Sequence, residues 1–269
     1  MNRIDAKFKE LKEKNVPAFI PFITAGDPSL DATRELILEF DRRGADMIEL
    51  GVPFSDPIAD GPVIQASYYR ALSSGIKLSD ILELVRDVRQ SSEIPIVSMI
   101  SQSILFKYGC KKFIKNAVNA GLDGATIPDL PIEEAEEIIE TGKGEGFNVV
   151  CFIAPTTTDS RVDLIVRKSQ GFLYYISVVG ITGSKNELSD EIVNNIQKIK
   201  KVTSLPVALG FGISTPEQAK MAGKIADGVI VGSAIVREID RHSNQDRTVL
   251  INEVGEFVGE LVHSTKNQN

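Results

Sequence analysis

The sequence has few of the residues that build metal centres and disulfide frameworks. It contains two cysteines, Cys110 and Cys151, and two histidines, His242 and His263, which both lie near the C-terminus. Two cysteines are too few for a disulfide framework or a zinc cluster, and this favours a reducing compartment. The shortage of histidine argues against a His-rich metal site.

Long apolar runs and an excess of positive charge are also missing. No apolar stretch is long enough to cross a bilayer, and the charged segment 1–14 predicts a helix rather than a targeting signal. We therefore expect a cytoplasmic protein with no membrane contact. The chain has 30 Lys and Arg against 37 Asp and Glu, a net charge of −7. It lacks the basic field that drives nucleic-acid binding, so no nucleic-acid partner is expected.

What the sequence does have is a regular alternation of strand-like and helix-like segments. Hydrophobic residues make up 42% of the 269 residues and charged residues 25%, as in an ordinary globular protein. Eight apolar runs predict strands: Ala18–Thr24, Asp46–Leu50, Pro95–Ile100, Gly124–Ile127, Asn148–Ile153, Phe172–Ser177, Pro206–Gly210 and Gly228–Val231. Several have no polar alternation, which is typical of strands buried on both faces of a parallel sheet.

Segments of helical period separate these runs. They include Leu30–Arg43, Leu78–Arg89, Lys112–Ala120, Ile132–Thr141, Asp190–Lys200, Pro216–Ala222 and Thr248–Val262. Gly44, Gly121 and Gly223 follow such segments and are interpreted as helix stops. Eight strand–helix units predict an α/β fold: a single (β/α)8 TIM barrel over residues 1–269, with an additional N-terminal helix. An open doubly wound sheet is the alternative, although the first strand lacks a G-x-G-x-x-G turn.

Glu49 is the first candidate for chemistry, because the active site of such a barrel lies at the C-terminal ends of its strands. It stands among apolar neighbours in the second predicted strand. Burial disfavours the ionised carboxylate and should raise its pKa, which suits a group that exchanges protons near neutral pH. An ion pair with a Lys or Arg of a neighbouring strand is an equally good interpretation of the residue alone.

The Pro-rich segment 51–62 follows directly. It carries Phe54, Asp56 and Asp60 among three prolines, and rigid loops of this kind often hold functional side chains. Asp60 could face back toward Glu49. Either aspartate could instead only form a turn with the neighbouring Pro57 or Gly61, and we favour that interpretation for Asp56 but not for Asp60.

Glycines follow the three last predicted strands. The segments are Gly180–Ser184, Gly210–Ser214 and Gly232–Ala234. Glycine lets the backbone approach a ligand, and a helix that begins at Ser233 would present free N–H groups. Each glycine-containing segment alone could simply form a turn. Three such segments after three successive strands indicate a phosphate monoester bound by backbone amides rather than by Lys or Arg.

These residues resemble the tryptophan synthase alpha subunit family over nearly the whole chain. The motifs are Pro21–Pro28, Glu49–Pro57 continuing to Asp60–Pro62, Asp129–Pro131, Gly180–Gly183, Gly210–Ser214 and Gly232–Val236. The resemblance implies retro-aldol cleavage of indole-3-glycerol phosphate to indole and glyceraldehyde 3-phosphate, without metal or cofactor. It also implies a β-subunit partner in an α2β2 heterotetramer, which receives the indole.

The resemblance also assigns roles to residues. Glu49 matches the catalytic acid–base, and Asp60 matches the carboxylate that engages the indole N–H. The remaining substrate-binding matches are Phe22, Tyr174 and Phe211 around the indole, Thr182 on a mobile loop, and Gly183, Gly212, Gly232 and Ser233 at the phosphate. Tyr174 should point into the barrel and Tyr175 toward the helices.

The third predicted strand departs from the family pattern. Ser101 and Ser103 stand where the family usually has a tyrosine and an asparagine, in a region that borders the indole pocket and the β-subunit contact. A stand-alone lyase that releases free indole, and a weakly catalytic paralogue that regulates a partner, therefore stay open as alternatives. The loop Gly183–Leu188 is expected to be poorly ordered without ligand.

Overall fold

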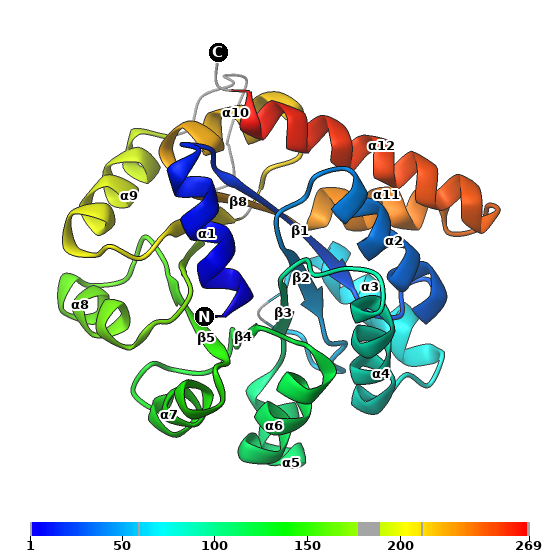
Figure 1. Cartoon of the computed structure of the whole chain (residues 1–269), viewed down its shortest axis with the longest axis horizontal. Coiled ribbons are helices and arrows are strands. Elements are labelled where there is room, and N and C mark those ends of the chain that lie inside the picture. The colour runs from blue at the N-terminus through cyan, green and yellow to red at the C-terminus, as the bar shows by residue number, and fades with distance from the viewer. Residues whose placement is uncertain (1, 59, 177–188, 211, 268–269) are drawn as a thin grey trace.

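The computed structural model describes residues 2–58, 60–176, 189–210 and 212–267. Within these residues eight parallel strands close into a barrel in chain order, with β1 paired to β8. Figure 1 shows the strands in the centre and the helices around them. The strands are β1 (Ala18–Thr24), β2 (Ile48–Gly51), β3 (Ile96–Met99), β4 (Gly124–Thr126), β5 (Asn148–Ile153), β6 (Leu173–Ile176), β7 (Val207–Gly210) and β8 (Gly228–Val231).

The described helices comprise one that precedes the first strand and others that follow a strand and cover the outside of the barrel. They are α1 (Arg3–Glu13), α2 (Leu30–Arg42), α3 (Pro62–Ser73), α4 (Leu78–Arg89), α5 (Gln102–Tyr108), α6 (Cys110–Ala120), α7 (Glu136–Glu145), α8 (Asp159–Lys168), α9 (Asp190–Val202), α10 (Pro216–Ile225), α11 (Ser233–His242) and α12 (Arg247–Lys266). The predicted (β/α)8 barrel with an additional N-terminal helix is thus confirmed, and the open sheet is wrong.

Two predictions about helix ends are wrong. Gly223 does not stop a helix: α10 continues to Ile225, and the glycine lets α12 pack closely, because a Cβ there would lie 2.8 Å from the Thr265 carbonyl oxygen. The helix predicted from Ile132 begins at Glu136, because a turn precedes it, with the Glu134 N–H bonded to the Pro131 carbonyl. Gly44 and Gly121 do follow helices, with φ of 88° and 99°.

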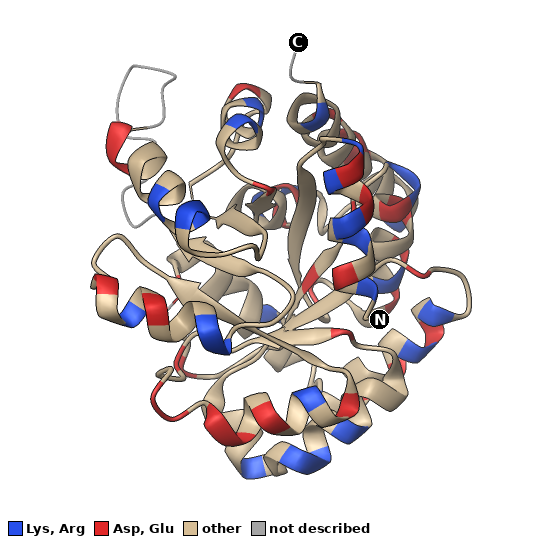
Figure 2. Cartoon of the chain, turned by 60° about the vertical axis from the view of Figure 1, so that its left-hand side comes forward, with Lys and Arg blue, Asp and Glu red and all other residues tan. Residues whose placement is uncertain are grey.

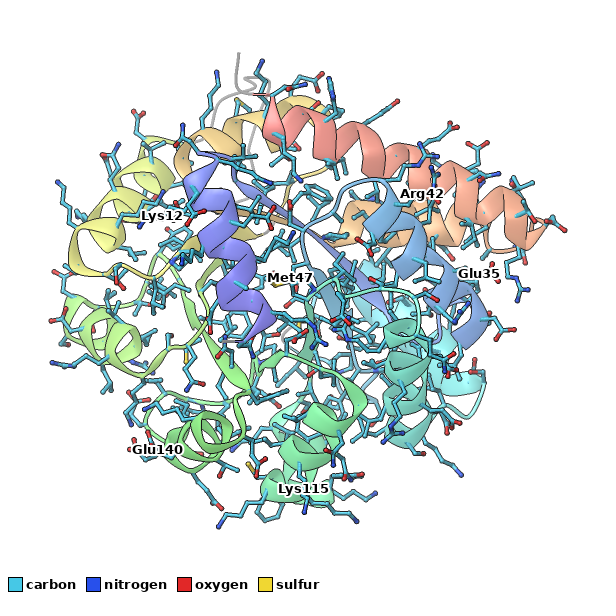
Figure 3. The ribbon with its side chains drawn as sticks, in the orientation of Figure 1. Lys12, Glu35, Arg42, Met47, Lys115 and Glu140 are labelled. Atoms are coloured by element: carbon cyan, nitrogen blue, oxygen red, sulfur yellow. The ribbon has the colours of Figure 1, made fainter. Side chains whose placement is uncertain are left out.

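The barrel interior and the layer beneath the helices form separate apolar clusters. Met47 is fully buried at the centre of the barrel in Figure 3, whereas Glu35, Arg42, Lys115 and Glu140 lie on the outer surface. Figure 2 also separates the charged surface from the apolar interior: acidic and basic residues are spread over the helices, and few lie on the strands. Such burial on both faces explains why the strands read as continuous apolar runs.

Helix α1 covers the N-terminal end of the barrel. Its N-cap, Asn2, donates side-chain hydrogen bonds to the carbonyl oxygens of Asp123 and Gly146. Asp123 directly precedes β4, and Gly146 lies two residues before β5. Ile4 is fully buried beside Gly124, the first residue of β4. The opposite, C-terminal end of the barrel stays free for a site.

Candidate functional site

A cavity of about 330 Å³ lies at the C-terminal ends of the strands. Neighbouring strands bring its walls together: Phe22 of β1 is in register with Glu49 of β2. Gly51, two residues further on, leaves room for this wall, since a Cβ there would lie 2.6 Å from the Phe22 ring. Of the predicted site residues, this cavity collects Phe22, Glu49, Asp60, Tyr174, Gly212, Gly232 and Ser233.

Glu49 is buried in the cavity floor, with 2% of its surface exposed. The Thr126 hydroxyl donates a hydrogen bond to Oε1 over 3.0 Å, and the Tyr174 hydroxyl donates one to Oε2 over 3.4 Å. Neither partner is charged, so the alternative of an ion pair with a Lys or Arg is wrong for the described residues. Burial raises the pKa of Glu49 to about 7, against the opposing effect of these two hydrogen bonds.

Tyr174 points into the barrel, as expected. Its ring packs on Phe152 with centroids 4.9 Å apart. Gly210 of β7 makes space for it, because a Cβ at that position would lie 2.5 Å from the Tyr174 ring. The next residue, Tyr175, faces the helices and its hydroxyl accepts a hydrogen bond from Asn195 of α9. The strand alternation therefore assigns one tyrosine to the cavity and one to the outer layer.

Asp60 reaches the same cavity from the loop before α3. Gln65 fixes the loop by donating hydrogen bonds to the carbonyl oxygens of Asp60, over 2.8 Å, and of Pro57, over 3.2 Å. Burial and the nearby negative charge of Asp129 raise the pKa of Asp60 to about 6. Among the described residues its carboxylate has no hydrogen-bond donor or cation. No side chain of the described part of the chain therefore competes with a ligand for this acceptor.

Asp56 differs from Asp60 in its surroundings. It is exposed, and its backbone carbonyl accepts a hydrogen bond from the Ile58 N–H over 2.9 Å. This geometry agrees with the interpretation of Asp56 as a turn residue.

The opposite wall of the cavity is suited to an anion. Helix α11 begins at Ser233 after the N-cap Gly232, and it has neither a capping side chain nor an acidic residue in its first turn. Gly212 has φ of +76°, a conformation that favours glycine. The nearest atom to a Cβ built on Gly232 would be the Phe22 Cβ at 3.5 Å, so no side chain crowds these amides. Free N–H groups at a helix N-terminus attract negative charge.

Three predicted site residues, Thr182, Gly183 and Phe211, lie outside the described residues, as does the loop Gly183–Leu188. Conversely, Thr126, Phe152 and Arg237 contribute to the site but were not predicted from the sequence. Thr126 could have been predicted from the sequence as a polar residue at the end of a short apolar run. Arg237 could have been predicted from its position one helical turn after Ser233.

Ser101, one of the two serines of the third loop, takes a local structural role. Ser101 caps α5, where its hydroxyl accepts the Ser103 N–H over 3.2 Å. The same hydroxyl donates a hydrogen bond to Asp129 Oδ2 over 2.7 Å, and the Gln102 N–H binds Asp129 Oδ1 over 2.7 Å. Ser101 thereby orients the carboxylate whose charge acts on Asp60.

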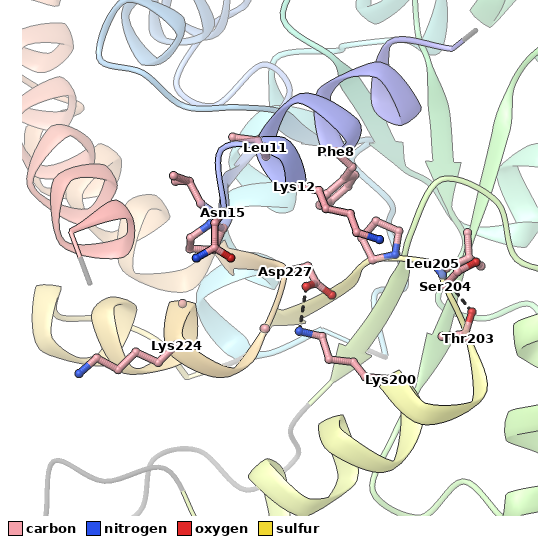
Figure 4. Close-up of a pocket in the computed structure, with 15 residues that line it drawn as sticks. Phe8, Leu11, Lys12, Asn15, Lys200, Thr203, Ser204, Leu205, Lys224 and Asp227 are labelled. Carbon is pink, nitrogen blue, oxygen red and sulfur yellow. Dashed lines mark hydrogen bonds and ion pairs between the residues drawn. The ribbon is translucent and has the colours of Figure 1, made fainter. Parts of the chain in front are cut away.

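A second cavity, of about 400 Å³, lies at the N-terminal end of the barrel (Figure 4). Phe8 and Lys12 of α1 form one side, and Lys200 and Asp227 form an ion pair of 2.8 Å at the other. This end of a barrel serves stability rather than catalysis. Glu49 and Asp60 do not line it.

Fold and cavity together define the class: a (β/α)8-barrel protein with a cavity at the C-terminal ends of its strands. Within that class, the chain belongs to the tryptophan synthase alpha chain family, whose model matches residues 8–266. It is 45% identical over 258 residues to the tryptophan synthase alpha chain of Caldanaerobacter subterraneus subsp. tengcongensis, which covers 96% of this chain and 97% of the relative.

Solved structures of the family agree. The chain is similar to tryptophan synthase subunit alpha from Legionella pneumophila str. Paris, with a TM-score of 0.91, 35% identity and 98% of each chain covered. It is also similar to a chain of the tryptophan synthase α2β2 complex from Pyrococcus furiosus, with a TM-score of 0.83 and 37% identity over 90% of this chain and 98% of that one.

The described residues contain no group of three or more His, Cys, Asp or Glu side chains that could hold a metal ion. Over the same part of the chain, no helix combines the length and the apolar character that a membrane span needs.

Proposed function

We propose that this protein cleaves indole-3-glycerol phosphate to indole and glyceraldehyde 3-phosphate, as the alpha subunit of a tryptophan synthase. One observation carries the proposal: Glu49, buried with a pKa raised to about 7, shares a cavity with the carboxylate of Asp60, which no other described residue pairs with. Two carboxyl groups in different environments can divide proton transfer and charge stabilisation between them.

The reaction is a retro-aldol cleavage of a carbon–carbon bond. The indole carbon that bears the glycerol chain gains a proton, and the chain hydroxyl next to that bond loses one. The protonated ring then accepts the electron pair of the breaking bond, so the nitrogen-bearing ring carries transient positive charge. Glu49 transfers protons, since its pKa of about 7 makes both protonation states accessible near neutral pH. Asp60, with a pKa of about 6, is mostly ionised at pH 7 and accepts a hydrogen bond from the indole N–H group.

The substrate phosphate binds at the glycine-rich wall. The backbone N–H groups of Gly212, Gly232 and Ser233 hold it, together with Gly183 by family resemblance. Phe22 and Tyr174 then flank the indole between the phosphate wall and Glu49.

A β subunit takes up the indole in an α2β2 heterotetramer. The name of the Pyrococcus furiosus relative supports this assembly. Ile58, on the Asp60 loop, is 84% exposed and Phe106, on α5, is 89% exposed. Exposed large apolar side chains around the site are typical of a partner contact.

We also propose that residues 1–269 form one domain that acts in the cytoplasm. The closure of the barrel by β1 and β8 supports the single domain, because it joins the two ends of the chain. A chain with only two cysteines has no disulfide framework to form, and this favours a reducing compartment.

The test is indole release from indole-3-glycerol phosphate by the purified protein, alone and with a β subunit. We expect turnover that the β subunit stimulates strongly. High turnover without stimulation would select the stand-alone lyase, and stimulation of the β subunit without lyase turnover would select the regulatory paralogue.

A further inference from the structure

Arg237 is the one basic residue among the described residues that line the site cavity. It lies on α11, one helical turn after Ser233, and its side chain is exposed. Within the described part of the chain it forms no hydrogen bond or ion pair. A lone guanidinium at the rim of a cavity that otherwise carries two carboxyl groups needs a physical explanation.

The helix directs Arg237 toward the anion-binding wall. Residues at positions i and i+4 share one face of a helix, and helical side chains lean toward the N-terminus. Ser233 and Arg237 have this spacing, and both line the site cavity, so Arg237 lies on the helix face that carries the free N–H groups.

The acidic residues of α11 do not neutralise Arg237. Glu238 pairs with Arg241 over 2.8 Å, and Asp240 pairs with Arg70 of α3 over 3.1 Å. Among the described residues, no acidic side chain therefore pairs with Arg237, and its positive charge faces the cavity rim.

The electrostatics of the chain make this charge useful. The chain has a net charge of −7, and Glu49 and Asp60 face the same cavity that receives a phosphate dianion in the proposed reaction. Backbone amides supply partial charges only, whereas a guanidinium adds a full positive charge and forked N–H donors that suit phosphate oxygens.

We propose that Arg237 binds the outward-facing oxygens of the substrate phosphate and accelerates its capture. This inference rests on the proposed function and adds to it a side chain that selects phosphorylated over neutral substrates. It departs from the expectation from the sequence that backbone amides, rather than Lys or Arg, bind the phosphate. Arg237 acts on the phosphate and not at Glu49, so it lowers KM and leaves the proton-transfer step unchanged.

The first experiment compares Arg237→Gln, Arg237→Lys and the control Arg241→Gln. The control removes the same charge one turn further along α11, where Arg241 pairs with Glu238. We expect Arg237→Gln to raise the KM for indole-3-glycerol phosphate about tenfold, with kcat nearly unchanged and a weaker dependence on salt. Arg237→Lys should recover part of the loss, and Arg241→Gln should behave as the wild type. A fall in kcat alone, or equal effects of Arg237→Gln and Arg241→Gln, would overturn the inference.

A second arm uses the reverse reaction of indole with an aldehyde. Arg237→Gln should impair condensation with glyceraldehyde 3-phosphate and leave that with neutral glyceraldehyde unchanged. Equal impairment with both aldehydes would show that Arg237 only maintains the structure.

A third arm does not depend on catalysis. Inorganic phosphate is titrated into each protein and followed by ³¹P NMR. Arg237→Gln should bind it more weakly than the wild type, Arg237→Lys should recover part of the loss, and Arg241→Gln should bind it as the wild type does. If the wild type releases no indole but this difference holds, the proposed reaction is wrong and the phosphate role of Arg237 stands. If indole is released and the difference is missing, the inference about Arg237 fails by itself.

Discussion

Thr126 donates a hydrogen bond to Glu49 across the barrel interior, from a strand that is separated from β2 by the whole of β3. The bond spans 3.0 Å, and both groups are buried. Because the donor is a neutral hydroxyl, it orients the carboxyl group without locking it in the ionised form. Glu49 thus has a fixed position and a pKa near neutrality at the same time.

The substitution Thr126→Val tests this relationship. Valine has nearly the same shape but no hydroxyl, so the ionised form of Glu49 loses its shorter hydrogen bond and its pKa rises further. We expect the apparent pKa near 7 in the pH profile of kcat to move upward by roughly one unit. Tyr174→Phe, which removes the longer bond of 3.4 Å, should cause a smaller shift. A profile that neither variant changes would contradict the role of Glu49 in proton transfer.

The substitution Glu49→Gln should abolish indole release and spare the fold. Glutamine resembles the protonated carboxyl group in shape, and no buried cation loses its partner, because Thr126 and Tyr174 are the hydrogen-bond donors to Glu49. Indole release and urea unfolding, measured on the same preparation, check the two expectations. Turnover at the wild-type level would remove Glu49 from the mechanism.

The same variant should change how stability depends on pH. The folded protein holds the Glu49 proton up to about pH 7, whereas the ordinary pKa of the group is 4.5. The unfolded chain therefore ionises first, and folding stability falls as pH rises from about 4.5 to about 7. A shift of this size corresponds to on the order of 3 kcal/mol. Relative to wild type, Glu49→Gln should gain stability over this interval, and parallel curves would contradict the expectation.

Asp60→Asn should remove most of the activity, by roughly 10²-fold or more, because the neutral amide no longer stabilises positive charge on the indole ring. Asp56→Asn is the matched control on the same loop, since Asp56 is exposed and does not line the site cavity. It should keep nearly full activity. Steady-state kinetics of indole release measure both variants, and near-normal kinetics of Asp60→Asn would make Asp60 a turn residue only.

Gly232→Asp should raise the KM for the phosphorylated substrate steeply, because it places a carboxylate against the phosphate. Gly232→Ala is the steric control: the Gly232 φ of −113° lies outside the left-handed region, and a built Cβ approaches no atom closer than 3.5 Å. The alanine variant should fold normally and lose much less affinity. Binding of indole, which has no phosphate, should change little in either variant. An unchanged KM in Gly232→Asp would place the phosphate elsewhere.

The barrel was predictable from the sequence because its signals are local. Apolar runs such as Ala18–Thr24 and Asn148–Ile153 mark strands with the bounds that the structure has. The prediction that a helix ends at Gly223 was wrong, because the sequence alone does not distinguish a glycine inside a helix from one that ends it. Only the close approach of Thr265, more than forty residues away in the sequence, distinguishes the two.

The site was predictable to the extent that its residues are close in the chain. Glu49 and Asp60 fall on one strand and its following loop, so their proximity follows from the chain itself. Thr126 lies 77 residues from its partner, and only the closed barrel brings the two together. Glu238 and Asp240 do not neutralise Arg237, because they form ion pairs with Arg241 and Arg70, and no local pattern of the sequence reveals these pairs.

Helix α1 blocks one mouth of the barrel, with Ile4 buried and Asn2 bonded to the carbonyl oxygens of Asp123 and Gly146. Substrate entry and product departure therefore share the opposite opening. A companion enzyme that consumes indole must dock over that opening to intercept the molecule before it diffuses away, whereas attachment on the α1 side would leave the product to bulk water. By closing one end of the barrel, helix α1 thus leaves the other end as the side on which an indole-consuming enzyme can bind and receive the product.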